Sequence, residues 1–174
     1  LEQLRADFGD EIANLVDGVT KLDKLTYGPT AEAETVRKMV IAMSRDIRVL
    51  VIKLADRLHN ARTWGFVTSE SASRKARETL DIYAPLAHRL GMQGLKQQLE
   101  DLAFASMYPK RYAELDHLVS GRSPERDVYL AKAMSDVRAK LTDLNIDSDV
   151  TGRGKHLWSI YEKMIQKGKE FDEI

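Results

Sequence analysis

Apolar residues recur along most of the chain at the three- and four-residue spacing that places them on one face of an α-helix. The first such stretch holds a possible break at Gly9, and the second follows a loop at residues 26–30. Their apolar positions are Leu4, Phe8, Ile12, Leu15, Val16 and Val19 in the first, and Val36, Met39, Val40 and Met43 in the second. The pattern then predicts a helix from Asp46, its N-cap, to Trp64. Residues 49–52 could also form a buried strand, but the length of the stretch favours a helix.

The same spacing continues through the middle of the chain. It predicts a helix from Ser69 to Gly91, kinked at Pro85 because proline lacks a backbone donor. A further helix is stopped by Pro109, which suits the first position of the next one, and Ser123 begins another. The pattern therefore predicts about seven helices in sequence.

The periodicity changes only between Asn145 and Gly152. There Ile146, Ser148 and Val150 alternate with Asp147, Asp149 and Thr151, and this alternation predicts one strand. A strand needs a partner, so we expect its partners beyond Ile174, in a second domain that starts near the end of the chain. The chain also starts within a helical pattern, and we expect it to be a fragment cut at both ends.

Composition narrows the class of protein. The 174 residues are 43% hydrophobic and 31% charged, which is enough for one core of ordinary size. The 27 Lys and Arg balance the 27 Asp and Glu, and no apolar run approaches the roughly 20 residues that cross a bilayer. Membrane and nucleic-acid binders are therefore disfavoured. Without cysteine the chain has no disulfide, thiolate zinc site or cysteine nucleophile, and a cytoplasmic location is favoured.

The helix predicted from Asp46 carries the first candidate site. At about 100° per residue, four polar residues fall on one stripe, while Leu50, Leu54, Leu58 and Ala61 form the opposite apolar face. The polar residues, called the polar stripe below, are Lys53, Asp56, Asn60 and Thr63. A carboxylate, an amide and a hydroxyl in line could hold a metal and a polar ligand. The alternative is the solvent face of an amphipathic helix.

Metal binding by this chain alone is not expected. The four histidines, His59, His88, His117 and His156, are widely separated, and no two have the i, i+4 spacing of a helical metal site. Asp56 alone cannot complete a coordination sphere, so other ligands would have to come from outside the chain.

The second candidate site is a basic turn that enters a helix after Gly152. Lys155, Ser159 and Lys163 fall at i, i+4 and i+8, which lines two ammonium groups and a hydroxyl along one face near the helix N-terminus. That arrangement suits phosphate, although its spacing is not that of a P-loop. The alternative is a helix start with scattered surface lysines.

Four runs of residues resemble one known family, the long RelA/SpoT-type enzymes or bifunctional Rel proteins. The runs are residues 16–22 (VDGVTKL), 53–60 (KLADRLHN), 83–91 (YAPLAHRLG) and 152–164 (GRGKHLWSIYEKM). The resemblance implies an all-α, HD-type hydrolase domain that uses Mn²⁺ to remove pyrophosphate from the 3′ position of (p)ppGpp. It also implies a following synthetase domain of nucleotidyltransferase-like α/β fold that transfers pyrophosphate from ATP to GTP or GDP, for which we expect Mg²⁺. These alarmones drive the stringent response.

The resemblance assigns roles to individual residues. Asp56 matches the last metal ligand of the HD site, Asn60 and Thr63 match nucleotide contacts, and we place Lys53 of the same stripe with them. On the synthetase side, residues that match the ATP and phosphate site are Arg153, Lys155, His156, Ser159 and Lys163. Gly154 departs from the family, which usually has proline there, so we expect a looser loop.

The predicted domains are the C-terminal part of the hydrolase domain with connecting helices at 1–108, and the start of the synthetase domain, its first strand and helix, at 109–174. The chain carries one of four expected metal ligands, so we expect it to be inactive alone. The expected partners are ppGpp, pppGpp, GTP, GDP and ATP, with the ribosome contacted only through regions outside this chain, and neither membrane nor DNA. The alternative is a non-catalytic helical module that binds nucleotide or regulates a partner.

Overall fold

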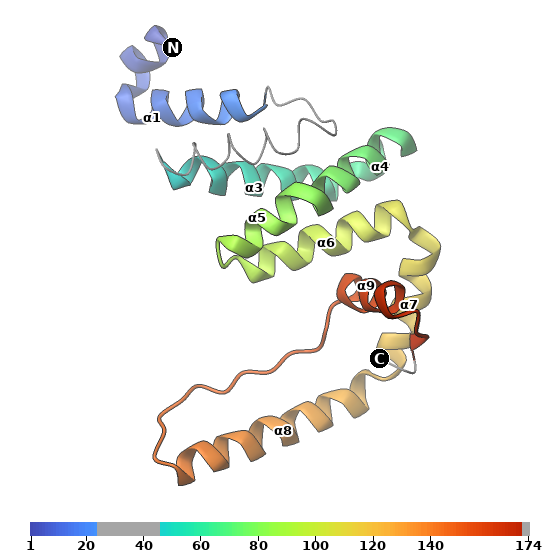
Figure 1. Cartoon of the computed structure of the whole chain (residues 1–174). Helices are drawn as coiled ribbons and strands as arrows, with labels where there is room; N and C mark the ends of the chain where they lie inside the picture. Colours follow the sequence, from blue (N-terminus) through green and yellow to red (C-terminus); the bar gives the residue numbers. More distant parts are fainter. Residues whose placement is uncertain (24–45, 172–174) are drawn as a thin grey trace. The chain divides into compact units, whose positions relative to one another are not determined.

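The computed structural model describes residues 1–23 and 46–171, and in this part of the chain every regular element is a helix (Figure 1). The chain divides into two compact units, Leu1–Met107 and Tyr108–Ile174. The predicted loop at 26–30 and the helix predicted around Val36 to Met43 lie outside the described residues. No described helix is both long enough and apolar enough to cross a membrane.

Among the described residues of the first unit, every regular element is a helix or a helical turn. They are α1 (Glu2–Asp23), α3 (Ile47–Arg62), the 3₁₀ turn η1 (Trp64–Phe66), α4 (Ser69–Glu78), the π-helical turn η2 (Thr79–Tyr83), α5 (Ala84–Arg89) and α6 (Gln93–Met107). In Figure 1, α3 lies between α1 and the α4–α5 segment, and α6 packs on α3, α4 and α5. Over residues 1–23 and 46–107 this unit is all-α, as predicted.

Local signals placed several helix ends correctly. Gly9 breaks α1 with a φ of 83°, a conformation that glycine adopts without strain. The side chain of Asp46 caps α3 by accepting a hydrogen bond from the Arg48 backbone at 2.9 Å, so the helix prediction for residues 49–52 is confirmed over the strand alternative. A hydrogen bond from the Arg48 side chain also lowers the pKa of Asp46.

The core of the first unit gathers around α3. The apolar face predicted for this helix is buried at Leu50, Leu54 and Ala61 and half-buried at Leu58. Two groups of buried residues surround it, one with α5 and α6, the other around Trp64. The first contains Val49, Leu50, Leu54, Ile82, Tyr83, Ala84, Leu86, Ala87 and Leu99, and the second Ala61, Trp64, Ala72, Ala76 and Ala103.

A π-helical turn directly before Pro85 accommodates this proline within the helix. The backbone N–H of Ala84 donates to the carbonyl of Thr79, five residues earlier, so α4, η2 and α5 follow one another without a loop. Widening the helix by one residue relieves the clash between the proline ring and the preceding turn. The predicted kink is therefore a π-turn, and Gly91, with a φ of 74°, ends the segment as expected.

Gly18 sets the distance between α1 and α3. A Cβ atom at this position would lie 2.8 Å from Cγ2 of Val49, which is itself buried. We expect Gly18→Ala to lower the free energy of unfolding by about 1 kcal/mol, because overpacking outweighs the gain in helix propensity. Gly94→Ala in α6, where no atom lies within 4 Å, is the matched control and should be neutral or slightly stabilising. Urea unfolding of both variants tests this, and a stabilised Gly18→Ala would contradict it.

The second unit contains α7 (Pro109–Gly121), α8 (Ser123–Asp143) and α9 (Leu157–Lys167). Both predicted starts, at Pro109 and Ser123, are confirmed. Asn145 ends α8 in the left-handed region, with a φ of 56°, and the N–H of Ile146 donates to the carbonyl of Leu141.

The strand predicted between Asn145 and Gly152 is not formed in the described part of the chain. Instead, the segment runs back beside α8 without a strand partner (Figure 1), and Arg138 of that helix donates to the carbonyl of Val150. A strand needs a second edge for its backbone hydrogen bonds, and here a helix surface takes that place. The α/β part of the predicted fold is therefore not seen.

Candidate functional site

Asp56 is the centre of the polar stripe on α3. Its side chain is 49% exposed. Lys53 Nζ lies 3.4 Å from Oδ2, and Asn60 Nδ2 donates to Oδ1 at 3.1 Å. Because both carboxylate oxygens are held from the same helix, the carboxylate is fixed in orientation while one side stays open to solvent. This geometry suits an oxygen ligand for a cation.

The other members of the polar stripe differ in their surroundings. Lys53 is buried, with 9% of its side chain exposed, so its positive charge needs the Asp56 carboxylate nearby. Asn60 and Thr63 are exposed, but the Thr63 hydroxyl donates to the Asn60 backbone carbonyl at 2.9 Å. The structure thus brings Lys53, Asp56 and Asn60 together, whereas Thr63 turns back to the helix end.

Arg57, the residue after Asp56, fixes α3 against the π-turn, a role that no pattern in the sequence predicted. Its guanidinium lies 3.0 Å from the Glu78 carboxylate and 3.9 Å above the centre of the Tyr83 ring. The two charged side chains are only 12% and 23% exposed. We call the contacts of Arg57 with Glu78 and Tyr83 the clamp. Since Glu78 and Tyr83 lie at the two ends of η2, these contacts can be recognised only once the π-turn is known.

The described residues do not complete a metal site. No group of three or more His, Cys, Asp or Glu side chains close enough to share a metal ion occurs among residues 1–23 and 46–171. Of the four histidines, His88 contacts Gln93 at 2.7 Å and His156 contacts Ser159. Asp56 therefore offers a cation a single carboxylate in this part of the chain.

The second candidate site lies before and along α9. The neighbouring Lys155 lowers the pKa of Lys163, because a side-chain hydrogen bond from Lys155 favours the uncharged amine of Lys163 and the two positive charges repel each other. His156 precedes the first turn of α9, and one of its ring nitrogens lies 3.1 Å from the Ser159 hydroxyl. Arg153 is exposed beside them. Two adjacent ammonium groups repel each other, so an anion between them would be stabilising.

Buried residues of α9 hold this arrangement in place. Leu157 and Ile160 are buried, and the Tyr161 ring lies 5.5 Å from that of Tyr108 and 5.7 Å from that of Trp158. Leu157 and Ile160 therefore anchor α9 on the core of the second unit, while Lys155 lies just before the helix and Lys163 within it.

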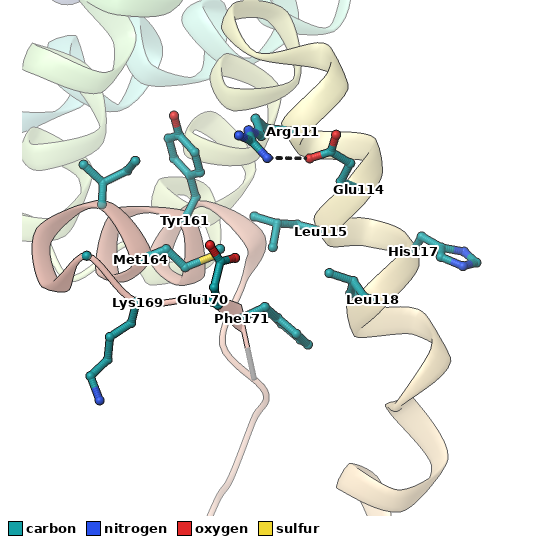
Figure 2. Close-up of a pocket in the computed structure, with 12 residues that line it drawn as sticks. Arg111, Glu114, Leu115, His117, Leu118, Tyr161, Met164, Lys169, Glu170 and Phe171 are labelled. Carbon is teal, nitrogen blue, oxygen red and sulfur yellow. Dashed lines mark hydrogen bonds and ion pairs between the residues drawn. The ribbon is translucent and has the colours of Figure 1, made fainter. Parts of the chain in front are cut away.

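A pocket of about 770 Å³ lies between α7 and α9, where no site was predicted (Figure 2). Its wall is apolar at Leu115, Leu118 and Met164, and the Arg111–Glu114 ion pair of 2.9 Å lies at its edge. None of the predicted phosphate-binding residues lines it. It forms where two helices distant in sequence meet, so no local pattern signals it.

Comparison with known proteins gives one family model and several relatives. The model, described as HD domain, matches residues 1–93, which include α1, α3 and the whole polar stripe. The residues of the second candidate site lie outside this match.

The relatives are long proteins. The chain is 60% identical to a GTP pyrophosphokinase of Streptomyces coelicolor over 174 residues, all of this chain and 20% of that protein. It is 59% identical to the bifunctional (p)ppGpp synthase/hydrolase RelA of Mycobacterium tuberculosis over 157 residues, 90% of the chain and 21% of that protein. It is 47% identical to the bifunctional (p)ppGpp synthase/hydrolase SpoT of Escherichia coli over 176 residues, 100% of the chain and 25% of that protein. The predicted resemblance is confirmed, and the chain spans about a quarter or less of these relatives.

Proposed function

Because the chain belongs to the HD domain family, we propose that Leu1–Met107 is part of a hydrolase that removes pyrophosphate from the 3′ position of (p)ppGpp, leaving GDP or GTP. The observation that carries the proposal is the open carboxylate of Asp56, fixed by Lys53 and Asn60 within the residues that match the HD domain. The relatives named as (p)ppGpp synthase/hydrolases support it.

For the metal, we propose that Asp56 supplies one ligand to Mn²⁺, a cation that favours carboxylate oxygen. The described residues alone do not fit this ion, since they offer no group of three His, Cys, Asp or Glu side chains that could hold it. When bound, Mn²⁺ would supply a Lewis acid and an activated water. The contribution of this chain is orientation, because Lys53 and Asn60 prevent the carboxylate from rotating away.

For the nucleotide, we propose that Asn60 contacts (p)ppGpp through its amide oxygen while its NH₂ group holds Asp56. Thr63, exposed at the end of α3, would contact the same nucleotide by rotating its hydroxyl away from the helix. Lys53 was predicted to contact nucleotide as well. Because Lys53 is buried, we propose that its charge acts on the nucleotide indirectly, by orienting the Asp56 carboxylate.

A second activity is proposed for Tyr108–Ile174, as the start of a synthetase that transfers pyrophosphate from ATP to GTP or GDP. The neighbouring ammonium groups of Lys155 and Lys163 favour it, because a polyphosphate would relieve their repulsion. Arg153, His156 and Ser159 would complete the phosphate contacts. Mg²⁺ is expected with ATP, but the described residues hold no group of three possible ligands for it, so the proposed role of these side chains is to bind and orient phosphate.

The test is pyrophosphate release from ppGpp, measured with Mn²⁺ and after addition of EDTA. It uses the 174-residue chain and a full-length enzyme that carries it. We expect Mn²⁺-dependent release from the full-length enzyme and none from the chain alone, because one carboxylate cannot hold the ion. Synthesis of ppGpp from ATP and GDP with Mg²⁺ is measured in parallel. A folded full-length protein with neither activity would favour the non-catalytic helical module instead.

A further inference from the structure

The segment that carries Arg153 and Lys155 lies along α8 in a regular register. Arg138 Nη2 donates to the Val150 carbonyl at 3.3 Å. A Cβ atom at Gly152 would lie 2.8 Å from Leu130 Cδ1 and 2.9 Å from Met134 Sδ. Two residues further on, a Cβ atom at Gly154 would lie 3.2 Å from Nε and Cζ of Arg126. Residues 150, 152 and 154 thus contact successive turns of α8, and the segment runs antiparallel to that helix.

The spacing explains why this register fits. Four residues of an α-helix rise about 6 Å, and two residues of extended chain span about 6.6 Å. The positions 150, 152 and 154 can therefore all lie against α8 at once. In extended chain the intervening side chains point to the other side, which leaves Arg153 and Lys155 exposed there together. A Cβ atom at residue 152 would have to displace the side chains of Leu130 and Met134, and one at residue 154 would crowd the Arg126 guanidinium, so glycine at both positions lets the segment lie close to α8.

The guanidinium of Arg126 lies directly against the position that a Cβ atom would take at residue 154. Its Nε atom is buried, although 38% of the side chain is exposed, so the guanidinium forms a wedge between α8 and the segment. Glycine gives the backbone extra freedom at residue 154, and the Arg126 guanidinium restricts part of that freedom from the α8 side. The backbone between Arg153 and Lys155 is thereby held at a fixed distance from α8.

We propose that Arg126 is a positioning residue for polyphosphate binding, and that Gly154 is the residue that admits it. The proposal rests on the proposed role of Lys155 and Lys163 in binding the phosphates of ATP. Arg126 acts through the backbone of residues 153–155, so that Arg153 and Lys155 are directed at one polyanion. A planar guanidinium fills the space between α8 and the backbone at Gly154, whereas the smaller ammonium group of a lysine would not.

The experiment measures binding of inorganic triphosphate to the 174-residue chain by isothermal titration calorimetry at low salt. We expect Arg126→Gln, Arg126→Lys and Gly154→Ala each to weaken binding about tenfold. The double variant of Arg126→Gln and Gly154→Ala should be no weaker than either single variant, because both remove the same contact. Lys132→Gln, which removes one charge from an exposed position of α8, is the matched control and should change affinity less than twofold.

Three results would overturn the inference. The first is wild-type affinity in Arg126→Lys, and the second is an equal loss in Lys132→Gln, since either means that Arg126 acts only as a charge. The third is additive losses in the double variant, which would mean that Arg126 and Gly154 do not act through the same contact. Lys155→Gln separates this inference from the proposed function. If Lys155→Gln weakens binding and Arg126→Gln does not, only the role of Arg126 fails. If the wild-type chain does not bind triphosphate, or Lys155→Gln has no effect, the polyphosphate site itself fails.

Discussion

Asp56→Asn is expected to lower pyrophosphate release from ppGpp by at least about a hundredfold in a full-length enzyme that carries this segment. The amide keeps the shape of the carboxylate and its hydrogen bond from Asn60, but it loses the negative charge that a cation requires. The measurement is kcat at saturating Mn²⁺ and ppGpp, beside synthesis of ppGpp from ATP and GDP. Synthesis should be unchanged, because the lysines proposed to bind phosphate lie in the other unit.

The matched control for Asp56→Asn is Asp10→Asn in α1. This change removes the same charge from the same unit, at a side chain that is 84% exposed and paired only with Arg5 among the contacts described. It should leave hydrolysis within about twofold of wild type. Asp56→Asn also removes a negative charge from beside the buried Lys53, so thermal unfolding must be recorded for both variants. More than half of the wild-type hydrolysis in a folded Asp56→Asn enzyme would remove Asp56 as a ligand.

Helix ends were predictable because short-range chemistry determines them. Asp46 caps α3 with its own side chain, Gly9 and Gly91 adopt positive φ, and Pro109 starts α7. Each of these signals depends on no more than a few neighbouring residues. The polar stripe was predictable for the same reason, since helical periodicity alone places Lys53, Asp56 and Asn60 on one side of α3.

What the sequence did not reveal depends on contacts between distant elements. The alternation from Ile146 to Thr151 predicted a strand, and that prediction was wrong for the described residues, because a strand depends on what lies beside it, which here is α8. The pocket between α7 and α9 has the same origin. Pro85 signals a disturbed helix, yet the choice of a π-turn over a kink depends on what its neighbours Glu78 and Tyr83 contact.

Arg57→Ala is expected to lower the free energy of unfolding of the first unit by about 3 kcal/mol. Removing a largely buried guanidinium leaves the Glu78 carboxylate without its partner and the Tyr83 ring without its cation. Urea unfolding followed by Trp64 fluorescence measures this, in a Trp158→Phe background so that only the first unit reports. Arg62→Ala is the matched control, because this exposed arginine of α3 contacts only Gln98 among the contacts described, and it should cost less than about 1 kcal/mol.

The same clamp has a consequence for hydrolysis, since Arg57 adjoins Asp56 and holds α3 against both ends of the π-turn. If the clamp orients the polar stripe, Arg57→Ala should lower kcat for ppGpp more than it raises KM, at a temperature where the variant is fully folded. Glu78→Gln should lower kcat less, because the Tyr83 contact remains. A double-mutant cycle between Arg57→Ala and Glu78→Gln then gives the energy of the ion pair itself. Additive effects on both stability and kcat would mean that the two side chains act independently and that the π-turn is not held by this pair.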